Sequence, residues 1–297
     1  MLINKVKITD IVVLVFLFVT GAIIVFGGNK TERFPILLSV RIVAFVVVFV
    51  VIKLHSDYNN KLTAFFRHFY PLIFTAYFYG ETGYYNNVFF SDLDGIIIRI
   101  EDKLIGFQPS IWFSNTCSSA WFNELMNFSY FSFYLIVLGF SLVLYLYRNE
   151  EFEKFFFIII FSFYSYYLFF VLFPVVGPQF YFPDKLAKIS NPLFFGKLVK
   201  LIQEMGETPT GAFPSSHVGI SWIILIIVSK IYKKFLIIIY TFALLICFST
   251  VYINAHYLVD VIAGFISAPF LYYTGLRIYK NYNKTQGYLT AKPISKY

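Results

Sequence analysis

The chain has 297 residues, of which 59% are hydrophobic and only 13% are charged. This composition excludes an ordinary soluble domain, because the apolar residues gather in runs of about 17 or more, long enough to cross a bilayer. The net charge of +8 does not indicate a nucleic-acid partner, since most of the lysines fall in short loops where they orient membrane spans. We therefore expect a multi-pass membrane protein.

Eight apolar runs predict eight transmembrane helices in an all-α, polytopic membrane bundle. The first run follows Lys5 and Lys7, and no small-x-small cleavage site comes after it, so we interpret it as a retained signal anchor. The third run carries Arg67, His68 and Pro71 near its start; if it did not cross, every later segment would invert. The predicted spans are 11–27, 35–54, 63–79, 124–147, 154–174, 214–229, 235–253 and 257–279.

Basic residues in the connections predict the orientation of these spans. With the N-terminus inside, fifteen of the twenty-four lysines and arginines fall on the inner side, and the lysine cluster at 230–234 is among them. The positive-inside rule then places both termini in the cytoplasm. The two histidine motifs described below lie on the opposite, periplasmic or lumenal face.

A first long connection on that outer side covers residues 80–123. Its segment Ser91–Ser110 has apolar residues at helical spacing, which is typical of a short helix lying on a membrane surface. We interpret its acidic residues as groups that cap or solvate this helix, although a cluster of carboxylates on the site's face can also bind a polyol head group. These residues are Asp92, Asp94, Glu101 and Asp102.

A second long connection, residues 175–213, is interrupted by several prolines and therefore cannot form one long helix. We interpret it as a cap over the site.

The pair His256 and Asp260 has the spacing of neighbours on one helix face. A carboxylate that accepts a hydrogen bond from one ring nitrogen fixes the tautomer and leaves the other nitrogen basic or nucleophilic. The alternative is a structural polar pair that bridges two helices.

The segment GAFPSSHVG (Gly211–Gly219) reads as the entry to a helix. Pro214 suits a first helical turn, and the free amides and positive dipole end of that turn form a seat for an anion. His217, at the same place, can donate a proton to an oxygen of the bound anion or remove one. The alternative is a helix entry with an ordinary cap.

Together, the two motifs combine an anion seat, an acid–base group and an oriented imidazole. This combination favours phosphoryl transfer through a phosphohistidine. A metal-dependent hydrolase fits less well, because His217 and His256 have no additional carboxylates nearby in the sequence. The two cysteines, Cys117 and Cys247, lie far apart and indicate neither a disulfide framework nor a zinc site. We expect no metal and no cofactor.

These motifs resemble those of a known family. The segment PSSH followed by S-x6-H-x3-D is similar to two signatures of the type 2 phosphatidic acid phosphatase superfamily, which also contains the vanadium haloperoxidases. The resemblance is closer to the branch of inositol phosphorylceramide synthases, which are inositolphosphotransferases. Motifs typical of that branch are found at Gly211–His217 and Thr250–Gly264, and the segments Glu101–Ser110 and Phe173–Pro178 also resemble it. The resemblance runs from about Arg67 to the end of the last span.

The resemblance implies a six-helix catalytic core preceded by two further N-terminal spans. It implies that His256 is the nucleophile, that Asp260 orients it and that His217 is the acid–base group at the leaving group. The backbone amides of Ser215 and Ser216 would hold the phosphate, and the reaction would need no metal.

The chain departs from the phosphatase pattern at two positions that commonly carry arginine, where it has Gln179 and Thr250. Both remain candidate phosphate-binding residues. Guanidinium groups clasp phosphate oxygens in pairs, so their loss weakens binding of a doubly charged monoester more than binding of a singly charged diester. We therefore favour a diester donor, although lysines at 185, 188, 197 or 200 can replace the missing charge.

The favoured function is transfer of a phospholipid head group to a lipid alcohol such as a ceramide-like acceptor. Hydrolysis of a lipid phosphate or prenyl pyrophosphate is the alternative, and a non-catalytic membrane protein or transporter is an alternative of another class.

We assign residues 1–60 to two N-terminal spans, 61–280 to the catalytic domain and 281–297 to a basic cytoplasmic tail. His55 and His68, on the predicted inner side, are interpreted as interface residues. The oligomeric state is left open.

Overall fold

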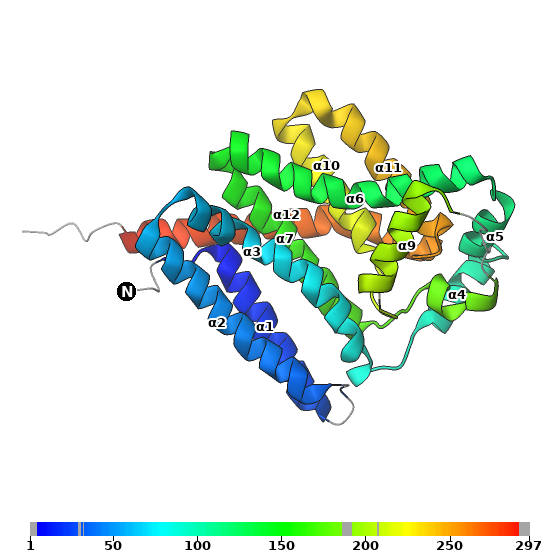
Figure 1. Ribbon diagram of the computed structural model, residues 1–297, viewed down its shortest axis with the longest axis horizontal. Helices are drawn as coiled ribbons and strands as arrows, with labels where there is room; N and C mark the ends of the chain where they lie inside the picture. The colour runs from blue at the N-terminus through cyan, green and yellow to red at the C-terminus, as the bar shows by residue number, and fades with distance from the viewer. Residues whose placement is uncertain (1–4, 29–30, 32, 186–191, 207, 291–297) are drawn as a thin grey trace, which may run out of the picture.

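The computed structural model describes residues 5–28, 31, 33–185, 192–206 and 208–290, and its regular structure is entirely helical (Figure 1). Apart from short 3₁₀ turns, the helices are α1 (Ile8–Gly27), α2 (Phe34–Tyr58), α3 (Lys61–Glu81), α4 (Asp94–Leu104), α5 (Pro109–Thr116), α6 (Ala120–Tyr147), α7 (Asn149–Leu172), α8 (Pro178–Tyr181), α9 (Phe194–Gly206), α10 (Ser216–Ile231), α11 (Leu236–Tyr252) and α12 (Leu258–Thr290). The all-α expectation is confirmed.

Each of the eight predicted spans coincides with a helix. Six of the described helices are long and apolar enough to cross a membrane: α1, α2, α6, α7, α11 and α12. The other two fall short, α10 because it has only 16 residues and α3 because polar residues interrupt its apolar ones. The last helix continues to Thr290, past its predicted end at residue 279.

Helix α7 forms the centre of the bundle. In its most apolar stretch of 18 residues, 72% is buried, against 28–50% in the corresponding stretches of the other five candidate spans. This explains why α7 is apolar on all sides rather than along one stripe. The N-terminal pair α1 and α2 packs beside α3 and α7, while α10 and α11 lie on the other side with α6 (Figure 1). Helix α12 packs along α7 and α10 and reaches the N-terminal segment, where the hydroxyl of Tyr282 donates to the carbonyl of Val6.

Buried ion pairs fasten the N-terminal helices to α3. Arg41 of α2 lies 2.6 Å from the carboxylate of Glu81, and Arg67 of α3 pairs with Asp10 of α1. Tyr70 also donates a hydrogen bond of 2.5 Å to Asp10. A charge at membrane depth is costly unless it is paired, so these contacts tie the helices together at both ends of the bundle.

The surface helix expected within Ser91–Ser110 exists as α4. Asp94 and Glu101 are fully buried, whereas Leu104 is 75% exposed. The interpretation of these two carboxylates as caps or solvating groups was wrong. They accept hydrogen bonds from backbone groups of other segments, which draws the polar stripe inward.

Helix α9 is the longer of the two α-helices in the described part of the proline-rich connection. It is amphipathic and lies across α6, where the carboxylate of Glu124 accepts hydrogen bonds from the amides of Phe195 and Gly196 at 2.6 and 3.1 Å (Figure 1). A carboxylate there satisfies first-turn amides that have no acceptor within the helix. As expected, the described residues of this connection, 175–185, 192–206 and 208–213, form no long helix.

Candidate active site

The entry to α10 is built by a helix cap and a close contact with α12. The side chain of Ser215 accepts a hydrogen bond of 3.4 Å from the amide of Val218, which makes Ser215 the N-cap. The amide of Ser215 donates to the backbone oxygen of Asp260 at 3.0 Å. Gly264, one turn further along α12, packs directly against the carbonyl of Ser215. The two helices that carry the motifs are therefore joined at their N-terminal ends.

His217 lies on the first turn of α10 in a box of aromatic rings from α6. The ring of Tyr130 stacks on the imidazole with 4.8 Å between ring centroids and 30° between planes, and Phe133 lies at 4.4 Å. The residue is only 7% exposed. The aromatic walls restrict the orientation of the imidazole, because a stacked ring has little room to turn.

His256 lies in the loop between α11 and α12, and backbone groups fix it. Its amide donates to the carbonyl of Thr250 at 3.1 Å, and its Nδ1 atom is 2.7 Å from the carbonyl oxygen of Ala212. A carbonyl oxygen can only accept, so Nδ1 carries the hydrogen. In the neutral ring Nε2 then carries no hydrogen and is the nitrogen that can accept a hydrogen bond or act as a nucleophile.

The two imidazoles meet although 39 residues separate them in the chain. The Nε2 atom of His256 lies 3.4 Å from Nδ1 of His217, with 5.6 Å between ring centroids. Both side chains are buried. The structure therefore brings together the two groups that the sequence analysis placed at one site.

Asp260 reaches His256 less directly than expected. Its Oδ2 atom is 3.6 Å from Nδ1, which is beyond hydrogen-bond distance, and accepts a hydrogen bond of 2.8 Å from the amide of Tyr257. The oriented proton on Nδ1 goes to Ala212 instead. Asp260 thus stabilises the loop beside His256 and places its carboxyl group close to the ring.

The remaining predicted phosphate-binding residues surround this pair in different ways. Ser216 begins α10, and its amide has no hydrogen-bond acceptor within the described part of the chain. Thr250 donates its hydroxyl hydrogen to the carbonyl of Cys247 at 3.1 Å. Gln179 accepts a hydrogen bond of 3.1 Å from the side chain of Gln203 on α9. Neither Thr250 nor Gln179 brings a cation to the site.

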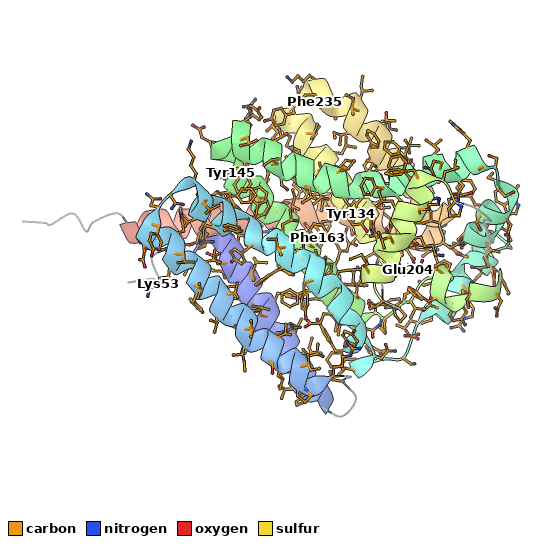
Figure 2. The ribbon with its side chains drawn as sticks, viewed as in Figure 1. Lys53, Tyr134, Tyr145, Phe163, Glu204 and Phe235 are labelled. Atoms are coloured by element: carbon orange, nitrogen blue, oxygen red, sulfur yellow. The ribbon has the colours of Figure 1, made fainter. Side chains whose placement is uncertain are left out.

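A cavity of about 410 Å³ opens beside His217. Its walls come from α3, α6, α7 and α9, and Ser216 and His217 lie at its polar end. Tyr134 and Phe163, labelled near the centre of Figure 2, are two of the aromatic residues that line it. A mostly apolar pocket of this size with a few polar groups at one end is the usual form of a small-molecule or lipid site.

Sequence reasoning missed several parts of the site. The carbonyl of Ala212 leaves no trace in a sequence pattern, and the stacking of Tyr130 depends on the packing of α6 against α10. Asp94 and Glu101 had one detectable signal, because residues seven apart share a helix face. Within the described residues, no group of three or more His, Cys, Asp or Glu side chains is placed to hold a metal ion.

A family model described as the PAP2 superfamily matches residues 96–274. The matched region contains both histidines and helices α6, α7 and α10, whereas α3, which supplies one wall of the cavity, lies outside it. No curated protein and no solved structure matches the chain.

Proposed function

Because this chain belongs to the PAP2 superfamily, we propose that it is a lipid phosphotransferase or phosphatase in which His256 is the nucleophile and His217 the acid–base group. The observation that carries this proposal is the contact between the two imidazoles. The ring nitrogen of His256 that carries no hydrogen, Nε2, lies 3.4 Å from Nδ1 of His217. Superfamily members typically work without a metal, and we extend this property to the present chain.

The proposed reaction has two displacements at phosphorus. In the first, Nε2 of His256 attacks phosphorus, the bond to the leaving oxygen breaks, and His217 donates a proton to that oxygen. In the second, His217 removes a proton from water or an alcohol, whose oxygen attacks the phosphohistidine and releases His256. Because the two nitrogens are in direct contact, the rings have to separate when the phosphoryl group enters.

The start of α10 is suited to hold the phosphate. A helix N-terminus presents amide hydrogens and a positive dipole end, both of which stabilise an anion. Since the amide of Ser215 is bound to Asp260, the amides of Ser216 and His217 are the better candidates for this role. Ser215 then serves mainly as the cap that holds them in place.

The apolar cavity supports a lipid substrate. It ends at Ser216 and His217, so a phosphate bound at the start of α10 can extend a hydrocarbon chain between α3 and α6. Burial of apolar surface contributes about 25 cal/mol for each Å², which makes such a cavity a favourable place for an acyl or prenyl chain.

For the donor we propose a phosphodiester, whose head group is transferred to a lipid alcohol. Support comes from Gln179 and Thr250, which are uncharged: the Gln179 side chain accepts a hydrogen bond from Gln203, and the Thr250 hydroxyl donates one to the carbonyl of Cys247. Of the candidate lysines, Lys185 lies over the ring of Phe182, and Lys200 is exposed beside Glu204. Lys197 is also exposed on α9, and position 188 lies outside the described residues. A site with few cations favours one negative charge over two.

For the topology we propose that the site faces the outer side of the membrane and that both termini are cytoplasmic. The support is the distribution of basic residues. The inner ends of the helices would carry the cluster at 230–234, and the end with α4 and α5 would be exposed outside.

The central test replaces the nucleophile in the purified full chain. We expect His256→Ala to fold, to keep the thermal unfolding midpoint of the wild type within a few degrees, and to lose all turnover. The matched control is His55→Ala, in which a histidine near the C-terminal end of α2 is removed and activity remains. A phosphohistidine that is stable in alkali and labile in acid should form in the wild type and be absent from His256→Ala. If both variants behave alike, the proposed role of His256 is wrong.

A second assay separates the two subclasses. The wild type is given phosphatidic acid, a prenyl pyrophosphate, and phosphatidylinositol together with a ceramide. Transfer of the head group to the ceramide supports the diester proposal, whereas rapid phosphate release from the first two substrates without transfer contradicts it. If no lipid phosphate reacts and His256→Ala unfolds the protein, the histidines form a structural lock in a non-catalytic protein.

A further inference from the structure

Two buried carboxylates on α4 face the loops around the site. Asp94, Ile97 and Glu101 form the buried stripe of this helix, with 0–1% exposure, and the spacing of three and seven residues places them on one side. Among the described residues neither carboxylate has a lysine or arginine partner in an ion pair. A buried carboxylate without a cation needs hydrogen-bond donors, and both find them in other segments.

Asp94 binds the two loops that flank His256. Its two oxygens accept hydrogen bonds from the amides of Val176 and Gly177 at 2.9 and 3.0 Å. The oxygen that binds Gly177 also accepts a hydrogen bond of 2.9 Å from the hydroxyl of Tyr257, the residue after His256. The side chain of Asp94 thus joins the first residue of α4 to the loop before α8 and to the loop before α12.

Glu101 holds the first turn of α12. Its Oε1 atom accepts a hydrogen bond of 3.1 Å from the amide of Val259. Its other oxygen is buried and has no partner among the described residues. A carboxylate at this position satisfies an amide that the helix itself cannot and interacts favourably with the dipole of α12.

The loop that carries His256 is therefore held on both sides. Tyr257 and Val259 bind α4 on one side, and on the other Gly177 packs so closely that a Cβ atom there would lie 2.9 Å from the carbonyl of Ala255. Gly177 has φ of +92°, a conformation that glycine adopts without strain. A shift of α4 would consequently move the residues directly before and after His256.

We propose that Asp94 and Glu101 are positioning residues, which hold the loop at residues 253–257 so that Nε2 of His256 faces His217. The inference rests on the proposed role of His256 as the nucleophile. Neither carboxylate touches the reacting atoms in this account. Their contribution is to keep a loop of few residues at a fixed place, which matters because a displacement of about 1 Å at a reacting group can cost a hundredfold in rate.

Steady-state kinetics of three variants provide the first test, with the substrate that the wild type turns over most rapidly in detergent micelles. Asp94→Asn keeps the size of the side chain but has one acceptor oxygen for three donors. Glu101→Ala removes the acceptor for Val259, and Glu101→Gln retains it. We expect Asp94→Asn and Glu101→Ala to lower kcat by about ten- to a hundredfold with KM within about threefold of the wild type, and Glu101→Gln to retain most of the activity.

The matched control is Asp102→Asn. Asp102 is exposed on the same helix, next to Glu101, and accepts a hydrogen bond from Gln108 at 2.8 Å that asparagine can also accept. The control should leave kcat unchanged. A purely structural role would lower kcat only in proportion to the folded fraction and would not separate Glu101→Gln from Glu101→Ala in the folded protein.

Hydrogen–deuterium exchange supplies a second readout that does not need turnover. In Asp94→Asn we expect faster exchange at the amides of Val176, Gly177 and Tyr257, and in Glu101→Ala at Val259, with no change in α2 or α6. Faster exchange together with the loss of kcat supports the inference. Unchanged exchange, or an unchanged kcat in folded Asp94→Asn and Glu101→Ala, overturns it. Faster exchange in a chain whose wild type has no activity would instead refute the proposed function.

Discussion

The substitution Gly264→Ala should separate the two helices that carry the histidines. Gly264 lies where α12 crosses the start of α10, and a Cβ atom there would be 2.5 Å from the carbonyl oxygen of Ser215. That oxygen accepts the first hydrogen bond of α10, from the amide of Gly219, so it cannot turn away without disturbing the helix. The two backbones have to move apart.

The required movement can be worked from the contact. Ordinary van der Waals contact begins at about 3.4 Å, so α10 and α12 would separate by about 0.9 Å near Ser215. Overpacking of this kind typically costs about 1–3 kcal/mol of stability. The same displacement between His217 and His256 would lower kcat by about a hundredfold, since reacting groups tolerate little misplacement.

The assay compares thermal unfolding and turnover of Gly264→Ala with those of Gly139→Ala in the same detergent. Gly139 is an exposed residue of α6, and a Cβ atom there would meet nothing within 4 Å. The control should be stabilised by about 0.5–1 kcal/mol, because alanine favours a helix interior over glycine. If Gly264→Ala kept both its unfolding midpoint and its kcat, the close approach of α10 and α12 would not be what holds the site together.

Three further predictions address the cavity, the acidic helix and the N-terminal helices. Ala76→Phe narrows the cavity on α3 and should lower kcat/KM for long-chain substrates by about tenfold while sparing short-chain ones, whereas Ile73→Phe on another face of α3 should change neither. Burial raises the pKa of Glu101 from 4.5 to about 7, so between these values the folded state holds a proton that the unfolded state releases. The temperature of half-unfolding should therefore decrease as the pH rises from about 4.5 to 7 and stay constant above pH 7. Glu101→Gln should remove this pH dependence. Glu81→Ala leaves the buried guanidinium of Arg41 without its carboxylate and should destabilise the protein by about 3–5 kcal/mol, measured by unfolding in detergent, whereas a loss below 1 kcal/mol would mean that the pair is not needed.

The family match and the geometry of the site support the superfamily but do not distinguish the branch of inositol phosphorylceramide synthases within it. The PAP2 superfamily is shown, and with it a membrane protein of a family that acts on phosphate-bearing lipids. Transfer of a head group to a lipid alcohol stays a proposal, which rests on the absence of arginine at Gln179 and Thr250. The comparison of phosphatidic acid, a prenyl pyrophosphate, and phosphatidylinositol with a ceramide decides it, because a transferase and a phosphatase differ in the acceptor that reaches His217.

Local sequence patterns determined the helices and the identity of the motif residues. Long apolar runs predict spans because backbone groups in a bilayer have to be paired within their own segment. The two serines after Pro214 predicted the start of α10, because capping depends on residues adjacent in the chain. Pro214 itself lies before the N-cap Ser215 rather than in the first turn, where the sequence pattern had placed it. The histidines stood out for a similar reason, since polar groups at the edge of an apolar run are costly unless they have a function.

Only the tertiary structure decided how these residues meet. The proton on His256 is directed by the carbonyl of Ala212 rather than by Asp260, and every residue type has such a carbonyl. Asp94 and Glu101 face inward, where they accept hydrogen bonds from amides of loops distant in the chain. Contacts of this kind depend on directions and distances between segments far apart in the chain, which residue spacing along one helix does not specify.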